Sequence, residues 1–494
     1  MRATPRSLVL ITVDCLRADR LGRGGQSPTM PFLDGLSKES FTFKNALASG
    51  IPTYYSLPAL LASRYPLALG RDVIGLAPAE NTIASELQQA GFRTAAFVAG
   101  NPYVCEAHGY GNGFDVFRNF LSAGEMDVPA DQYLPQGRSL RGRTNRMISR
   151  ACHRVPAFGA AYDELYFQYC KKVSAKSVES LDSLRKFPSA EVVINSAMAW
   201  LEQNSDGPFF LWIHLMDPHA PYYPQKDATH EIRGDSEEAL RLNSFWARED
   251  VSLRRLKTRS ASVEALYDDG VRWADRQIGR LASSLADLNL WDQCALTVTA
   301  DHGEEFLDHG GRFHPPLALH EELIRVPLLL RVPGRLPDRE IKEPFGLIDL
   351  APTLFDMLDL PSPASFRGHS CWRKLVTDES WDWPVLTECA YACTNPFRSE
   401  KRLAARILAV RKGEHKLVIN FALGTDELYD LGSDPRESRP LPAEIAVEVR
   451  RNLLECARKH VAESRASRDL DLRLAAQTRE LRAQWTQAEA IRPN

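Results

Sequence analysis

Short apolar runs alternate with amphipathic stretches along most of the chain. The runs are rich in β-branched and aromatic residues and are bounded by polar residues, which is typical of buried strands. We expect such strands at residues 7–13, 94–98, 208–215 and 294–300. The segments between them have helical spacing, most clearly at residues 81–90, 190–201 and 263–288. This alternation predicts an α/β fold with a large, mostly parallel sheet covered by helices on both faces.

The pattern changes in the last third of the chain, where the elements become shorter. Residues 345–358 have the spacing of a helix, and residues 408–419 resemble a hairpin that turns at Lys412-Gly413. We therefore expect three parts: a main α/β domain with an insertion, a smaller α+β subdomain and a charged helical tail. Their expected bounds are 1–364 (insertion 120–190), 365–442 and 443–494.

Composition narrows the possible partners and compartments. The chain has 494 residues, 44% of them hydrophobic, and a formal net charge of −3, so nothing indicates nucleic acid or an anionic membrane as a partner. No apolar stretch reaches the roughly 18 residues that span a bilayer, and the run at residues 8–13 is too short for a signal-peptide core. The nine cysteines lack CxxC spacing, which favours free thiols and a cytoplasmic location. The oligomeric state is left open.

Polar side chains follow several of the expected strands. Asp14 ends the first strand, and Asp301 and His302 end the strand at 294–300. Because the carboxyl ends of parallel strands meet at one edge of a sheet, these groups should lie together, as should those of other strand ends. The further candidates are Asn101, Asp217 and His219. Carboxylate and imidazole are ligands for divalent cations, so the sequence predicts a metal site here.

Thr53 lies where a loop breaks into an expected helix. A threonine hydroxyl is a poor nucleophile unless a metal, a base or a positive field activates it. The amino terminus of a helix supplies such a field, and a cation held by the strand-end groups would add to it. The alternative is that Thr53 only caps the helix.

Eight ordered segments carry a family resemblance. They are Ile11 to Gly22, Thr53 to Pro66, Pro208 to Tyr222, Tyr267 to Asp275, Asp301 to Glu304, Ile324 to Gly334, Leu347 to Leu354 and Glu427 to Pro435. Together they resemble the sulfatase family of the alkaline phosphatase superfamily over nearly the whole chain. The resemblance implies an α/β core with helices on both faces, followed by a smaller C-terminal subdomain.

The resemblance also implies roles for individual residues. Asp14, Asp301 and His302 would hold the metal, with Thr53 in the nucleophile position and in contact with the ion. His219 resembles the substrate-binding histidine of the family, and His314 falls where a lysine or histidine lies near the leaving group. His214 and Asn101 are further substrate-binding candidates. For His214, a hydrogen-bonded histidine on a buried strand is the alternative. For His320, a structural role is favoured.

Two positions depart from the sulfatase pattern. Thr53 replaces the Cys or Ser that a maturation enzyme oxidises to formylglycine, and threonine cannot yield that aldehyde; reading Ser56-Leu-Pro58 as a slipped motif is a weaker alternative. The Thr-x-x-Ser-x-Pro stretch instead resembles phosphoethanolamine transferases, in which threonine attacks phosphorus. Cys15 replaces a second metal-binding Asp, which weakens a calcium site because calcium takes six to eight oxygens. Zinc or manganese is therefore favoured over calcium or magnesium.

These observations predict a metal-dependent hydrolase or transferase of phosphate or sulfate esters with Thr53 as nucleophile. A phosphodiester or phosphonate-type ester of a small molecule, saccharide or lipid headgroup is the favoured substrate. One alternative is a sulfatase that works without formylglycine. The other is an inactive relative that binds anions in the same pocket.

Overall fold

The computed structural model describes most of the main domain and its C-terminal extension. The described residues are 4–22, 29–69, 74–78, 80–121, 187–225, 236–248, 251–315, 318–334, 339–390 and 406–464, with scattered positions between 148 and 165. The expected insertion at 120–190 and the end of the expected tail therefore lie largely outside the described residues.

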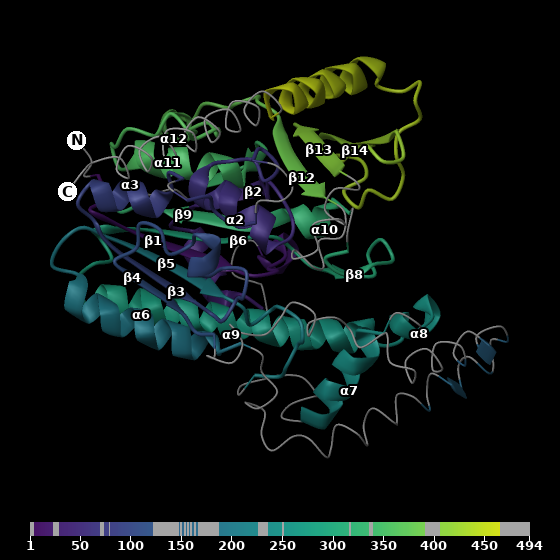
Figure 1. Cartoon of the computed structure of the whole chain (residues 1–494), viewed down its shortest axis with the longest axis horizontal. Helices are drawn as coiled ribbons and strands as arrows, with labels where there is room; N and C mark the ends of the chain where they lie inside the picture. Colours follow the sequence, from purple (N-terminus) through teal and green to yellow (C-terminus); the bar gives the residue numbers. More distant parts are fainter. Residues whose placement is uncertain are drawn as a thin grey trace, which may run out of the picture.

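A nine-stranded sheet forms the centre of the molecule (Figure 1). The strand order is β10-β2-β9-β6-β1-β5-β3-β4, with β11 paired to β2. The strands are β1 (Ser7–Val13), β2 (Phe41–Leu47), β3 (Arg93–Val98), β4 (Val116–Asn119), β5 (Phe209–Leu215), β6 (Cys294–Ala300), β9 (Arg325–Arg331), β10 (Arg339–Ile341) and β11 (Phe345–Gly346). Only β9 runs antiparallel to its neighbours. The predicted mostly parallel α/β sheet is confirmed.

Helices cover both faces of this sheet (Figure 1). One face carries the long helices α6 (Ala190–Asn204) and α9 (Ser260–Asp287), and the other carries α2 (Thr53–Ala62), α3 (Ile83–Gln89), α11 (Leu350–Met357) and α12 (Trp372–Thr377). The other labelled α-helices are α1 (Pro31–Ser37), α7 (Ser236–Trp246), α8 (Leu253–Lys257) and α10 (Glu321–Ile324). Because helices lie on both sides, all seven residues of β1 are buried, which explains its continuous apolar run.

One expected helix is shorter than the sequence suggests. Helix α11 begins at Leu350, whereas helical spacing had predicted a start at Phe345. Phe345 and Gly346 pair with β2, and a 3-10 turn at Leu347–Asp349 then leads into the helix. The sheet edge therefore takes the first residues of the segment, and that part of the prediction is wrong.

The C-terminal subdomain is a four-stranded antiparallel sheet with a helix on it. Its strands are β12 (Val385–Ala390), β13 (Arg406–Lys412), β14 (His415–Asn420) and β15 (Thr425–Asp430), in that order. The β13–β14 hairpin turns at Gly413, close to the predicted position. Residues 447–464 are helical, and Leu453 and Ala457 pack into the apolar cluster of this sheet.

Hydrogen bonds join β12 to the segments that flank α2. The Thr387 hydroxyl donates to the Ala48 carbonyl at 2.7 Å, and the Glu388 amide donates to the Ser49 carbonyl at 3.0 Å. The Glu388 carboxylate accepts the Leu67 amide at 2.9 Å and also contacts His460 at 2.6 Å. The segments before and after α2 are thus both held by the subdomain.

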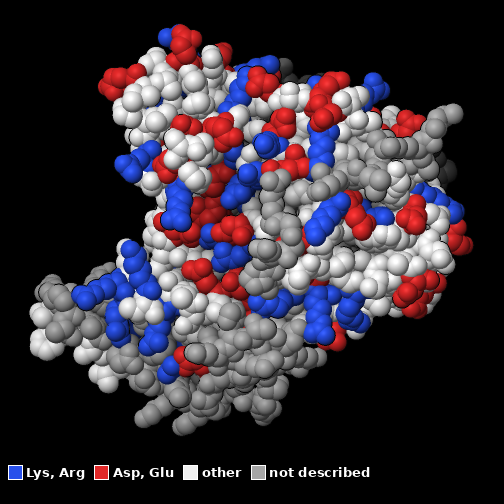
Figure 2. Space-filling model, turned by 180° about the vertical axis from the view of Figure 1, so that it is seen from behind, with Lys and Arg blue, Asp and Glu red and all other residues white. Residues whose placement is uncertain are grey.

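The distribution of surface charge and the character of the helices are the last features of the fold. Acidic and basic side chains are interspersed on the face shown in Figure 2, in keeping with the small net charge. Among the described residues, no helix has both the length and the apolar character that a membrane crossing needs.

Candidate active site

Adjacent parallel strands bring the predicted metal ligands to one level. In the sheet, Val13 of β1 is paired with Ala300 of β6 on one side and with Leu215 of β5 on the other. Asp14 and Asp301 are the next residues of their strands, so the shared register sets them side by side. Both are fully buried, as is His302. The expectation that these strand ends converge is therefore confirmed by the register.

Thr53 faces these groups from the opposite side. It is the first residue of α2, and its side chain is buried. Its Oγ1 lies 3.3 Å from Asp14 Oδ2 and 3.3 Å from His302 Nε2. No side-chain capping hydrogen bond is formed at this helix start. The hydroxyl lies at the positive end of the helix dipole, which favours an alkoxide, and it faces carboxylates whose negative charge disfavours one unless a cation neutralises them.

A sharp turn after Asp14 gives Cys15 a separate direction. Cys15 has a φ of +60°, which L residues seldom adopt and which recurs at functional sites. Tyr267 of α9 holds the turn by donating its hydroxyl to the Cys15 carbonyl and accepting the Arg17 amide, both at 2.9 Å. Burial, together with the nearby Glu304 carboxylate, raises the pKa of the Cys15 thiol well above its usual value.

Two buried histidines present Nε2 to the acidic cluster. His302 Nδ1 lies 2.8 Å from the Gly303 carbonyl, which can only accept, so Nδ1 carries the proton and Nε2 the lone pair. His214 Nδ1 lies 2.8 Å from Thr12 Oγ1, and its Nε2 lies 3.4 Å from Asp14 Oδ2. His214 is fully buried, so it lies behind Asp14 rather than on an open surface.

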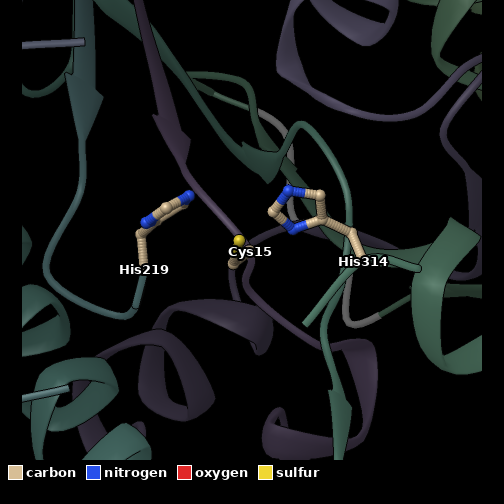
Figure 3. Close-up of side chains that lie close together, drawn as sticks. All are labelled: Cys15, His219 and His314. Carbon is tan, nitrogen blue, oxygen red and sulfur yellow. The ribbon is translucent and has the colours of Figure 1, made fainter. Parts of the chain in front are cut away.

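Two partly exposed histidines lie on either side of the Cys15 sulfur (Figure 3). His219 follows β5, and its Nδ1 is 2.5 Å from the Ala220 carbonyl. His314 follows the short strand β8 (Arg312–Phe313), and its Nδ1 is 3.7 Å from Oε1 of the buried Glu304. Burial lowers the pKa of His314, but the Glu304 carboxylate outweighs burial and leaves this pKa raised. The ring centres of His219 and His314 are 5.9 Å apart.

The two buried carboxyl groups respond oppositely to this setting. Burial raises the pKa of Asp14, but the imidazoles of His219, His214 and His302 outweigh it and hold the pKa well below its usual range. Burial, together with the charge on Asp14, raises the pKa of Asp301. The cluster therefore holds like charges that only a cation or a proton can neutralise.

The donor set fits a divalent cation. Asp14 Oδ1, Asp301 Oδ2 and His214 Nε2 are buried and have no hydrogen-bond partner among the described residues. Such atoms are costly to bury unless something binds them. The ligand atoms of Asp14, His214 and Asp301 all lie within 4.8 Å of one another. Asp14, Thr53, Asp301 and His302, with His214 behind them, would hold the ion.

Other predicted residues lie at the margin of this cluster. Asn101 Nδ2 donates to Asp14 Oδ2 at 3.3 Å, so Asn101 contacts a proposed ligand, and its substrate-binding role stays a prediction. Asp217 is not part of the cluster, because its carboxylate accepts the Ala190 amide at the start of α6. His320 precedes α10 and stacks on His309, in keeping with the expected structural role.

Glu304 and the direction of Cys15 were not anticipated from the sequence. Glu304 was noted only as part of the Asp301 to Glu304 motif, and Cys15 only as a missing oxygen ligand. Arg17, which donates to the Glu304 carbonyl at 3.1 Å and pairs with Asp308, fixes this loop. Motif membership was the one available signal for Glu304, and no pattern in the sequence reveals the positive φ of Cys15.

Comparison with known families decides where this site belongs. Residues 6–360 match the family described as Sulfatase, and residues 311–460 match the C-terminal family described as N-sulphoglucosamine sulphohydrolase. The chain belongs to the sulfatase family. It is accordingly an ester hydrolase of the alkaline phosphatase superfamily, as the sequence motifs predicted.

Curated relatives cover most of this sulfatase-family chain. An arylsulfatase of Clostridium perfringens is 25% identical over 87% of this chain and 89% of its own length. The multifunctional alkaline phosphatase superfamily protein PehA of Trinickia caryophylli is 24% identical, covering 90% of this chain and 92% of its own.

Solved structures share the fold at lower identity. The phosphonate monoester hydrolase of Agrobacterium radiobacter has a TM-score of 0.63 and 18% identity, covering 94% of this chain and 96% of that one. The protein BT4656, in complex with D-glucosamine-2-N,6-O-disulfate, has a TM-score of 0.64 and 17% identity, covering 94% and 98%. At these identities the likeness establishes the fold alone.

Proposed function

We propose that this sulfatase-family protein cleaves phosphorus esters, of the phosphodiester or phosphonate type, through a covalent intermediate on Thr53. The observation that carries the proposal is the position of Thr53 Oγ1, 3.3 Å from both Asp14 Oδ2 and His302 Nε2 at the start of α2. A divalent cation, with zinc or manganese favoured, would supply charge neutralisation and a lower pKa for a coordinated hydroxyl.

The residues of the chain then have distinct tasks. Thr53 gives up its proton to water, and its oxygen forms a bond to phosphorus as the bond to the leaving oxygen breaks. The helix amino terminus stabilises the non-bridging oxygens as their charge develops. His219 and His314, on the open side of the cluster, stabilise or protonate the leaving oxygen.

Water then cleaves the Thr53 phosphoester and regenerates the hydroxyl. An acceptor hydroxyl in place of water would turn the same intermediate into a transfer reaction. An ester of a small molecule, a saccharide or a lipid headgroup is the proposed substrate. The recess beside His219, lined by Phe187, Met216 and Tyr223 among others, has room for little more than a water molecule, so the organic part would lie outside it.

The nature of residue 53 favours phosphorus over sulfur. Threonine cannot become formylglycine, so the aldehyde chemistry of sulfatases is closed to this chain. Its curated and structural relatives include a multifunctional superfamily protein and a phosphonate monoester hydrolase. A sulfate-ester hydrolase that uses unmodified Thr53 is the second candidate, favoured by the arylsulfatase relative.

The test is to trap the intermediate. Protein loaded with Zn²⁺ or Mn²⁺ is mixed with an aryl phosphonate monoester, an aryl phosphate diester or an aryl sulfate, quenched in acid and digested. Mass spectrometry of the peptide that contains Thr53 should find a phosphoryl or phosphonyl adduct, absent from Thr53→Ala. A sulfated Thr53 peptide would support the second candidate, and turnover without any adduct would overturn covalent catalysis. A metal-loaded protein that turns over none of the three would support the inactive anion-binding relative.

A further inference from the structure

We infer that Cys15, His219 and His314 form a second cation site, distinct from the Asp14/Asp301/His302 site, that takes zinc through a thiolate and two imidazoles. The ligand atoms of these three side chains all lie within 4.8 Å of one another. They come from three separate loops that follow β1, β5 and β8 and converge at the open side of the acidic cluster (Figure 3).

The turn at Cys15 lies between the two sites. Asp14 faces Thr53, whereas the Cys15 sulfur lies 3.9 Å from Nδ1 of His302, on the opposite edge of the ring from the Nε2 that faces Thr53. The Cys15 sulfur also lies within 4.8 Å of ligand atoms of Asp14 and His302, so the two sites adjoin at Cys15. The direction of the thiol is fixed by the left-handed backbone of Cys15 and by the Tyr267 hydrogen bonds.

His219 is oriented as a metal ligand is, and His314 has a carboxylate near one ring nitrogen. Histidines that bind metals almost always donate the other ring N–H to a carbonyl or a carboxylate, which fixes the tautomer. His219 donates Nδ1–H to the Ala220 carbonyl, so its Nε2 keeps the lone pair. His314 has Nδ1 facing the Glu304 carboxylate at 3.7 Å, which directs Nε2 away from Glu304.

Glu304 is a buried carboxylate that lies beside His314. It is fully buried, and neither of its oxygens has a hydrogen-bond partner among the described residues. Among the described residues, its ion pair is with His314. A carboxylate behind a histidine is a common second-shell arrangement at zinc, where it raises the basicity of the imidazole. His314 Nδ1 is itself a buried atom without a partner, so the pair is poised to tighten when Nε2 binds a cation.

The ligand chemistry selects the ion. One sulfur and two imidazole nitrogens suit zinc and exclude calcium and magnesium, which prefer oxygen. Three protein ligands leave the fourth tetrahedral position open, as at catalytic zinc sites. Because zinc bonds are about 2.0–2.3 Å long, small rotations of these side chains suffice to bring the three ligand atoms onto one ion.

The catalytic consequence, unlike ion binding itself, rests on the proposed function. His219 and His314 were assigned to the leaving oxygen. An ion held by them and Cys15 would neutralise that oxygen in place of an imidazolium proton, and the site would resemble the two-metal arrangements that clamp both ends of a phosphoryl displacement.

The test measures how many ions each protein molecule binds and whether a thiolate is one of the ligands. Full-length protein is stripped with a chelator, dialysed against Zn²⁺ and assayed by inductively coupled plasma mass spectrometry. A parallel titration with Co²⁺ follows the near-ultraviolet thiolate-to-cobalt absorption. We expect two equivalents of zinc and a thiolate band in the wild type. Cys15→Ser should lose the band and one equivalent, whereas Asp301→Asn should lose the other equivalent and keep the band.

Three further variants test for misfolding and for binding by non-specific thiols. Cys456→Ser, in the C-terminal helix, should keep both the band and both equivalents. Glu304→Gln should weaken the second ion about 10- to 100-fold, the usual effect of a second-shell partner, and partly exposed His314→Gln should abolish it. One equivalent in the wild type, no thiolate band, or a band that survives in Cys15→Ser would overturn the inference. If the protein binds one equivalent of zinc and still forms the Thr53 adduct, the second cation site is overturned but the proposed function is not.

Discussion

The central sheet and the four-stranded C-terminal sheet each lie beside a group of buried charges. The two groups differ in how far acidic and basic side chains are paired. In the C-terminal subdomain, Lys416 lies 2.7 Å from Glu437 and 3.1 Å from Glu321, and Arg411 lies 2.7 Å from Glu321. Two bases thus meet two acids. Burial lowers the pKa of Lys416, but the two carboxylates outweigh burial and leave this pKa raised.

At the end of the central sheet the charges are not balanced. Asp14, Asp301 and Glu304 are buried, and among the described residues their ion pairs involve only histidines. Unmatched buried charge destabilises a fold, whereas the matched cluster is neutral within the protein. The contrast supports the proposal that the first group binds ions and an ester, whereas the second stabilises the subdomain.

The sharpest way to break the comparison is to remove the nucleophile. Thr53→Ala should lower kcat/KM for the best phosphorus ester by at least about 10⁴-fold, the scale of loss when a covalent nucleophile is removed. Any loss of unfolding free energy should be far smaller, because Thr53→Ala removes only a hydroxyl and a methyl group. Steady-state kinetics beside the exposed control Thr377→Ala would check this. Activity within tenfold of the wild type would refute the role of Thr53.

The matched cluster should respond in stability. Lys416→Met removes the lysine that pairs with both Glu437 and Glu321, leaving Glu437 only the Glu321 amide and His320 among the described residues, and should lower the free energy of unfolding by about 3–5 kcal/mol. Lys412→Met, on the same hairpin but paired with the exposed Asp382, should cost less than about 1 kcal/mol. Urea unfolding of both variants measures the difference, and equal effects would contradict the contrast.

Acid should loosen the link between the two sheets. Burial raises the pKa of Glu388, but Arg406 and His460 outweigh burial and lower this pKa to about 2. Because the folded pKa lies below the unfolded one, the contribution of Glu388 is present above about pH 4.5 and is lost as the pH falls towards 2. Wild type should exceed Glu388→Gln in unfolding free energy by about 3 kcal/mol at pH 6 and by much less near pH 2.5. A difference that does not change with pH would argue against this ionic role.

The smallest expected effect is an increase, rather than a decrease, in the free energy of unfolding. In chelator-treated protein, Asp301→Asn removes one of two adjacent buried carboxylates and should raise the unfolding free energy by on the order of 1 kcal/mol. With metal added, the wild type should regain the advantage, since an ion that binds only the folded state stabilises it. Calorimetry of the two proteins with and without Zn²⁺ tests both signs.

The sequence predicted the frame of the site because that frame follows from regular structure. Buried apolar runs identify parallel strands, and the residues directly after them must share one edge. Asp14, Asp301 and His302 were found in this way, and the loop-to-helix transition located Thr53. These assignments required only periodicity and the geometry of a parallel sheet.

The remainder depends on irregular backbone and on contacts distant in sequence. Cys15 is separated from its neighbour Asp14 by a left-handed turn that no hydrophobic pattern encodes. Asp217 looked like a ligand but serves the α6 amino terminus, because the loop after β5 passes that helix. The start of α11 was misplaced because Phe345 and Gly346 pair with a strand almost 300 residues earlier.

The hydrogen bonds from β12 to the segments around α2 bear on how this enzyme can be dissected. A fragment ending near residue 364 would keep every side chain proposed to bind ions or ester. It would also remove the Thr387 hydroxyl and the Glu388 amide, which donate to the Ala48 and Ser49 carbonyls. The Glu388 carboxylate, which accepts from the Leu67 amide, would be lost as well. The segments on both sides of α2 would then lose these hydrogen bonds. We therefore expect the C-terminal strands to be needed to hold Thr53, the proposed source of the attacking oxygen, in position.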